Sequence, residues 1–123
     1  MQSPAQATHR ITVAAVQDVV GAHFGLTKGQ LLSRDRRRSI ARPRQIAMYL
    51  AKTMTQQSYP NLGRRFGSRD HTTVMHAVRR VAALRDTDLG VAILIDSFAL
   101  EIATAESAVH AQNVMNPSDL PVQ

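Results

Sequence analysis

Apolar residues recur every three or four positions along most of this chain, which is typical of helices that bury one face. The clearest example lies within 70–85, where the apolar stripe consists of Val74, Ala77, Val78 and Val81. The same spacing predicts helices at 8–24, 27–32, 43–56, at a short segment ending at Phe66, at 70–85 and at 88–105. We therefore expect an all-α fold, a compact bundle of about five to six helices.

Capping residues and glycines support several of these boundaries. Gly25 and Gly67 each follow a phenylalanine, at positions where a helix can end with a positive φ. Asp70 suits the N-cap of the next helix, because its carboxylate can accept the unpaired N–H groups of the first turn. Pro43 is expected in the first turn of its helix, since the missing proline N–H costs nothing there. The charged segment 33–42 is expected to be a surface loop.

The pattern predicts one domain between two ends of different character. Residues 1–7 are polar and are expected to be disordered, and 106–123, with two prolines, are expected to form a flexible tail. The domain itself, 8–105, ends in an additional helix at 88–105, whose apolar residues outside its main stripe are Ile93, Leu100 and Ala103. Two interpretations stay open: this helix only packs on the bundle, or its surplus apolar surface binds a partner protein or a second copy.

The segment 62–81 has the pattern of a helix-turn-helix. A short helix leads into the turn Gly67-Ser68-Arg69, and a longer helix follows from Asp70. The apolar stripe of this longer helix leaves polar residues on its other face, and they concentrate at its N-terminus. Such a helix suits the recognition position, in which it enters the major groove of DNA.

The net charge of +6 is distributed unevenly along the chain. Between Lys28 and Arg80 there are thirteen Lys or Arg residues and only two acidic ones, and no Lys or Arg follows Arg85. A basic middle and an acidic end indicate a face that binds a polyanion, with a merely solvated arginine-rich loop as the alternative. Aromatic residues make up only 4% of the chain, which disfavours base stacking as the main mode of binding.

The residue types in this basic region divide into two chemical roles. Arginines of the loop can neutralise phosphates, which gives affinity without sequence information, and one of them can enter an A·T-rich minor groove. Sequence can be read at the start of the second helix, where Asp70 can accept from a cytosine amine, His71 can donate to base edges and the Thr72 methyl can contact thymine. The helix N-terminus also favours a phosphate at Thr73. Asp70 has a competing role as the N-cap.

Several classes of protein are disfavoured. The absence of cysteine excludes disulfides and cysteine-based zinc sites. His71 and His76 lie about 140° apart on a helix, so no metal site is expected, and no cofactor is expected either. The chain has no glycine-rich GKT or GKS phosphate loop, and we expect no enzyme. No apolar run approaches the ~20 residues of a membrane span, so we expect a cytoplasmic, nucleoid-associated protein.

Two segments resemble the DNA-binding domain of the DnaA family of bacterial replication initiators. FGSRDHTTVMHA, at 66–77, resembles the family's signature, and RRRSIARPRQIAM, at 36–48, resembles its basic loop and following helix. The resemblance covers roughly 8–84. It implies the TrpR-like helix-turn-helix fold of the C-terminal DnaA domain and binding to double-stranded DNA at DnaA boxes.

The resemblance also implies roles for individual residues. The residues that match positions reading bases are Arg36, in the minor groove, and Pro60, Asp70, His71 and Thr72, in the major groove. The residues assigned to phosphate contacts are Arg38, Arg44, Gln45, Lys52, Thr73, His76 and, in a supporting role, Arg69.

Two functional hypotheses follow. In the first, the protein binds DnaA boxes and so modulates chromosomal replication initiation or its regulation. In the second, it is a protein-interaction regulator that binds the replication initiator or its regulators through the last helix, with DNA contact secondary.

Overall fold

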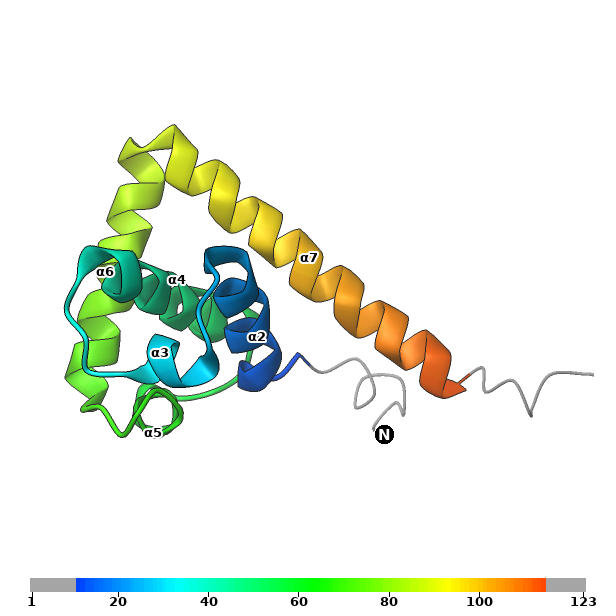
Figure 1. The fold of residues 1–123 in the computed structure, drawn as a ribbon. Coiled ribbons are helices and arrows are strands. Elements are labelled where there is room, and N and C mark those ends of the chain that lie inside the picture. The colour runs from blue at the N-terminus through cyan, green and yellow to red at the C-terminus, as the bar shows by residue number, and fades with distance from the viewer. Residues whose placement is uncertain (1–10, 115–123) are drawn as a thin grey trace, which may run out of the picture.

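A computed structural model of the chain describes residues 11–114, and the side chains of 11–105. Within this range the fold has helices and no strands, and the helices are α2 (Val13–Phe24), α3 (Lys28–Leu32), α4 (Arg38–Met54), α5 (Tyr59–Arg65), α6 (His71–Thr87) and α7 (Leu89–Val114). The first five form a compact bundle, and α7 crosses one side of it and extends beyond it (Figure 1). The predicted all-α bundle is confirmed.

Helix α4 lies at the centre of the bundle and contacts each of the other five described helices. Its apolar residues Ile46, Ala47 and Leu50 are buried in one continuous core. The predicted stripe of α6 is also buried in that core, with Val74 and Val81 completely inaccessible. Full burial of each such side chain contributes ~1.5–3 kcal/mol, so this core accounts for the position of α6.

The start of α2 differs from the prediction. Thr12 is extended, and its Oγ1 accepts the N–H of Ala15 at 3.1 Å, so the helix begins at Val13 rather than at residue 8. Gly25 ends the helix in the left-handed conformation with φ 68°, as predicted. The predicted disordered segment 1–7 lies outside the described residues.

The start of α4 was predicted five residues too late. The helix begins at Arg38, so Pro43 lies inside it and the surface loop is shorter than 33–42. The first turn is closed by the N–H of Ala41, which donates to the carbonyl oxygen of Arg37 at 2.7 Å, and it is anchored by Ile40, which is 6% exposed. Burial of Ile40 therefore offsets the hydrogen bond that Pro43 cannot make.

Helix α7 continues to Val114 instead of ending at about residue 105. The predicted tail, 106–123, is therefore helical in its first part, and 115–123 lie outside the described residues. No glycine or proline interrupts 91–116, so the sequence contains no strong stop signal there. No helix in the described part of the chain is both long and apolar enough to cross a membrane.

Candidate nucleic-acid interface

The turn between α5 and α6 is held tightly against α5. Gly67 and Ser68 both have positive φ, 78° and 57°, and the N–H of Arg69 donates to the carbonyl oxygen of Gly63 at 2.8 Å. A Cβ on Gly63 would lie 2.2 Å from the carbonyl oxygen of Arg69. Because only glycine permits this approach, the turn fixes α6 relative to α5 in the predicted helix-turn-helix.

Asp70 caps α6, as predicted. Its Oδ2 accepts the backbone N–H of Thr72 at 3.2 Å and the hydroxyl of the same residue, while Oδ1 lies 3.7 Å from Nδ1 of His71. The side-chain bond from Thr72, followed by the backbone bond, lowers the pKa of the Asp70 carboxyl. The side chains of His71, Thr72 and Thr73 are exposed. The first turn of α6 therefore presents an ionised carboxylate, an imidazole and hydroxyl groups to solvent.

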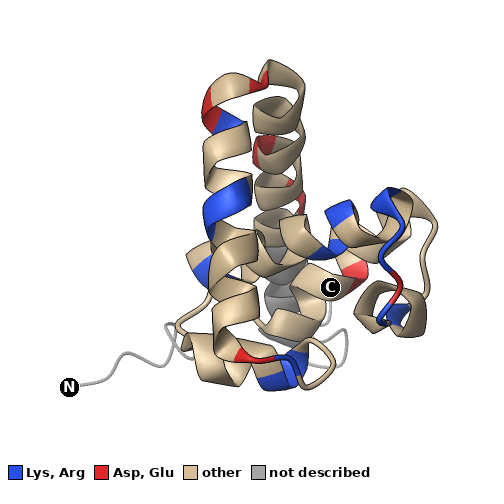
Figure 2. Ribbon diagram, turned by 90° about the vertical axis from the view of Figure 1, so that its left-hand side faces the viewer, with Lys and Arg blue, Asp and Glu red and all other residues tan. Residues whose placement is uncertain are grey.

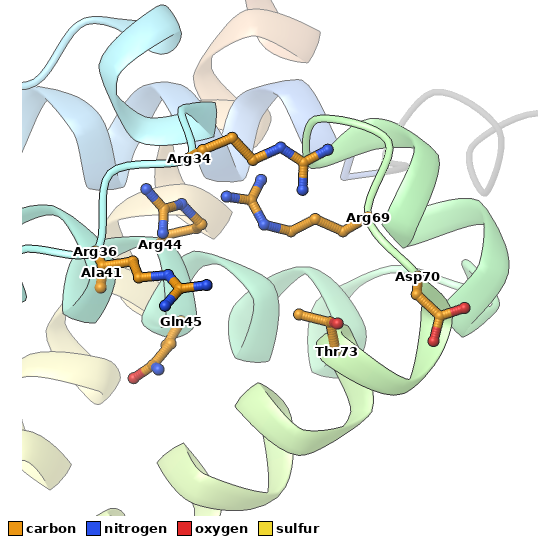
Figure 3. A pocket seen from close by; sticks show the side chains of 8 residues that line it. All are labelled: Arg34, Arg36, Ala41, Arg44, Gln45, Arg69, Asp70 and Thr73. Carbon is orange, nitrogen blue, oxygen red and sulfur yellow. The ribbon is translucent and has the colours of Figure 1, made fainter.

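The basic loop and the start of α4 lie beside this turn of α6 and enclose a hollow of about 530 Å³ with it (Figure 3). The residues lining the hollow are Arg34, Arg36, Ala41, Arg44, Gln45, Arg69, Asp70 and Thr73. The structure thus brings together six of the predicted site residues, from loop, α4, turn and α6. We call this surface the basic hollow.

Arg44, which was predicted to contact phosphate, is buried, and its side chain donates to backbone carbonyl groups. Its side chain is 7% exposed, and it donates from Nε to the carbonyl oxygen of Leu31 (2.8 Å) and from Nη2 to that of Asp35 (2.9 Å). Burial lowers the pKa of Arg44. Arg44 therefore holds α3 and the loop against α4, and its phosphate contact stays a prediction.

Arg69 has a similar structural role in the turn. Its Nη1 donates to the carbonyl oxygens of Phe66 (2.5 Å) and Leu32 (3.1 Å), and its Nη2 donates to that of Ser33 (2.5 Å). Burial, with the nearby charges of Arg44 and Arg34, lowers the pKa of Arg69 to about 10. The group is still a cation at neutral pH. Arg69 therefore ties the turn to the loop, and its supporting role in phosphate binding stays a prediction.

Sequence reasoning did not single out Arg34 or Asp35 as site residues. Arg34 donates to the turn, and Asp35 forms a two-oxygen ion pair with Arg37 whose shortest distance is 2.6 Å. The hydrogen bonds from Arg37 lower the pKa of Asp35 to about 2. The Asp-Arg-Arg order could have indicated a turn stabilised by Asp35, because aspartate commonly bonds the backbone two residues on. Nothing in the spacing distinguishes Arg34 from its neighbours.

The other six predicted residues do not line the basic hollow, and His71 and Thr72 are two of them. Pro60 is exposed in the first turn of α5, and His76 is exposed on α6. Lys52 donates to the carbonyl oxygen of Gln57 at 3.2 Å, and its Nζ lies 4.4 Å from the centre of the Tyr59 ring. Arg38, in the first turn of α4, lines a separate shallow pocket. The proposed interface thus extends beyond the hollow along α4, α5 and α6.

Charge is segregated over the molecule as the sequence predicted. Figure 2 shows Lys and Arg on the loop, the helix-turn-helix and the body of α6. Most of the described Asp and Glu residues lie where α6 meets α7 and along α7, and isolated acidic positions also lie on the loop and the turn. The acidic end is fixed by Arg85 of α6, which binds Asp96 of α7 at 2.6 Å. The basic side is therefore the side that can face a polyanion.

The comparison with protein families decides the identity of this helix-turn-helix. The family model described as "Bacterial dnaA protein helix-turn-helix" matches residues 13–81, from the first residue of α2 into α6. The chain belongs to this family. The match confirms the resemblance on which the residue roles depend, and it leaves α7 outside the matched range.

The relatives that match this chain are much longer than the region that they share with it. The chain is 56% identical over 79 residues to the chromosomal replication initiator protein DnaA of Caulobacter vibrioides, 57% to that of Sphingopyxis alaskensis and 53% to that of Brucella abortus. Each alignment covers 64% of this chain but only 16 or 17% of the relative. The chain thus spans a small part of the initiators that it matches.

Proposed function

We propose that this protein binds double-stranded DNA sequence-specifically, at sites of the DnaA-box type. The observation that carries the proposal is the basic hollow, which Arg36 of the loop lines together with Asp70 and Thr73 at the capped N-terminus of α6. A helix in the major groove and an arginine in the adjacent minor groove can then read one continuous site. Membership of the DnaA helix-turn-helix family supports this assignment.

The proposed contacts divide into those that read bases and those that bind phosphates. Arg36 reads the minor groove, and Pro60, Asp70, His71 and Thr72 read the major groove. Asp70 keeps its cap through Oδ2, so Oδ1 is the oxygen available to a base amine. The residues proposed to contact phosphates are Arg38, Arg44, Gln45, Lys52, Arg69, Thr73 and His76. These contacts supply affinity and set the register, and they make binding depend on salt.

The proposed physiological effect is modulation of chromosomal replication initiation or its regulation, through occupancy of DnaA boxes on the nucleoid in the cytoplasm. The relatives bear the name of replication initiator, and the match to the family's helix-turn-helix supports a DNA-binding role in that process.

Fluorescence anisotropy tests the proposal directly. A duplex with a box of the TTATNCACA type is compared with a scrambled duplex at two salt concentrations. We expect a preference for the box of about tenfold or more that persists at the higher salt concentration. Equal, strongly salt-dependent binding to both duplexes would contradict sequence-specific reading while leaving phosphate binding intact.

A second candidate function rests on α7. Leu89, Ile93 and Leu100 are 75%, 60% and 70% exposed, and their spacing places them within about 40° of one another on the helix. The buried residues Ile95 and Phe98 lie on the opposite face. This exposed stripe supports the alternative in which the protein binds the replication initiator or one of its regulators.

The two candidates are separated by a variant of α7. Leu100→Glu should abolish binding to the purified initiator or regulator without DNA, and should leave box affinity unchanged, if α7 is the docking surface. Binding of neither protein by the unmodified chain would exclude this second function.

A further inference from the structure

The loop that carries Arg36 is tied to the helix-turn-helix from both directions. Arg34 donates from Nη2 to the carbonyl oxygens of Gly67 (2.9 Å) and Ser68 (3.4 Å). Arg69, in the same turn, donates back to carbonyl oxygens at the start of the loop. Figure 3 shows the two side chains extending past each other in opposite directions. The separation between loop and turn is therefore set by a reciprocal pair of arginines.

The backbone on either side of Arg36 is also fixed. Oδ1 of Asp35 accepts the backbone N–H of Arg37 at 2.8 Å, which closes a turn with Arg36 at its centre. The carbonyl oxygen of Asp35 accepts from Arg44 in α4. The exposed side chain of Arg36 thus projects into the basic hollow from a braced segment.

We propose that Arg34 is a positioning residue for minor-groove reading, because it sets the distance between Arg36 and the base-reading start of α6. The inference rests on the proposed function. Hydrogen bonds to base edges weaken steeply when donor and acceptor are displaced, so two readers in adjacent grooves need a fixed separation. A loop without the tie would also have to be ordered on binding, which costs affinity.

A simple phosphate contact by Arg34 makes a different prediction. Phosphate contacts carry no direct sequence information, so their loss weakens binding to all duplexes equally. Loss of a positioning residue instead weakens discrimination at those base pairs that Arg36 reads. Discrimination at the pairs read by α6 should remain, since the cap of Asp70 and the turn bond between Arg69 and Gly63 do not involve Arg34.

The test measures the affinities of the unmodified protein and of Arg34→Met for three duplexes. One carries the TTATNCACA-type box, and the others replace the A·T pairs of its TTAT end by G·C or by inosine·cytosine. Inosine lacks the guanine amino group, so its pair resembles A·T in the minor groove and G·C in the major groove. For the unmodified protein we expect about a fivefold or larger loss on G·C, largely restored by inosine·cytosine. Arg34→Met should lose this difference and keep its discrimination against changes in the CACA half.

Three further variants sharpen the test. Arg34→Lys keeps a charged donor and should restore part of the discrimination. Asp35→Ala removes the brace and one negative charge, so it should bind every duplex more tightly and still discriminate less in the minor groove. Arg79→Met removes an exposed arginine of α6 and should change all three affinities by one common factor.

The outcomes separate the positioning role from the proposed function. An unmodified protein that binds box and scrambled duplex alike overturns both. A discriminating protein whose Arg34→Met variant loses the same factor on all three duplexes overturns the positioning role alone. If Arg34→Met does not fold, as judged by circular dichroism, an Arg34→Lys variant that loses the same factor on all three duplexes overturns it.

Discussion

His71 and Arg38 are both exposed, yet the proposal gives them opposite kinds of contact, one to a base and one to a phosphate. His71→Ala should cost ~1–3 kcal/mol on the box and little on a scrambled duplex, because it removes a base-reading donor. Arg38→Ala should weaken both duplexes alike and reduce the slope of log affinity against log salt by about one. Anisotropy titrations at several salt concentrations measure both. If the two variants lost affinity for all duplexes equally, the division into base-reading and phosphate-binding residues would be wrong.

Asp35 has a pKa of about 2 because Arg37 bonds its carboxylate, whereas its ordinary value is 3.8. A pKa lowered by folding means that the carboxylate stabilises the loop above about pH 4, and that this contribution disappears as the pH falls toward 2. Carboxyl-carbon NMR should therefore show Asp35 titrating near pH 2. In Arg37→Met the midpoint should rise toward the ordinary value. An unchanged midpoint in that variant would remove the ion pair as the cause.

At the scale of the elements, the close approach at Gly63 controls the helix-turn-helix. In Gly63→Ala the new Cβ meets the carbonyl oxygen of Arg69, which cannot rotate away, so the turn must move. We expect a loss of ~1–3 kcal/mol in the free energy of unfolding, with weaker box binding. Gly29→Ala is the control, since the nearest atom to its Cβ would be 3.9 Å away and alanine favours a helix. Chemical denaturation of both variants measures the difference, and equal stabilities would contradict the steric argument.

The features that the sequence predicted correctly are those that depend on residues only a few positions apart in the sequence. The cap at Asp70 and the stripe of α6 follow from residues within a few positions of each other, and both are confirmed. The start of α4 was missed because the burial of Ile40 depends on how the folded helices surround it. In the site, the exposed residues that we propose to read bases were identified by residue type and resemblance. The tie from Arg34 spans 33 residues, so no local spacing reveals it.

At the scale of the whole molecule, α7 belongs to the same core as the bundle and also presents a second apolar face. Phe98 is 1% exposed, and its ring centre lies 5.9 Å from that of Phe24 in α2 and 5.0 Å from that of His23. The interpretation that α7 packs on the bundle is thus confirmed, while the exposed stripe leaves the partner hypothesis to be tested. The two faces of one helix can be probed separately, because Leu100 lies on the exposed one.

Phe98→Ala should destabilise the whole bundle, since the cavity would open where α7 meets α2. The expected loss is ~3–5 kcal/mol, which lowers the Tm by roughly 10 °C or more. Unfolding should remain a single transition, because Phe98 shares its core with α4 and α6. Leu100→Ala removes a comparable apolar side chain from the exposed face and should leave the Tm nearly unchanged. Calorimetry that showed two transitions in Phe98→Ala, with the upper one at the Tm of the unmodified protein, would mean that α7 is an appendage and that the interface of α4, α5 and α6 is stable without it.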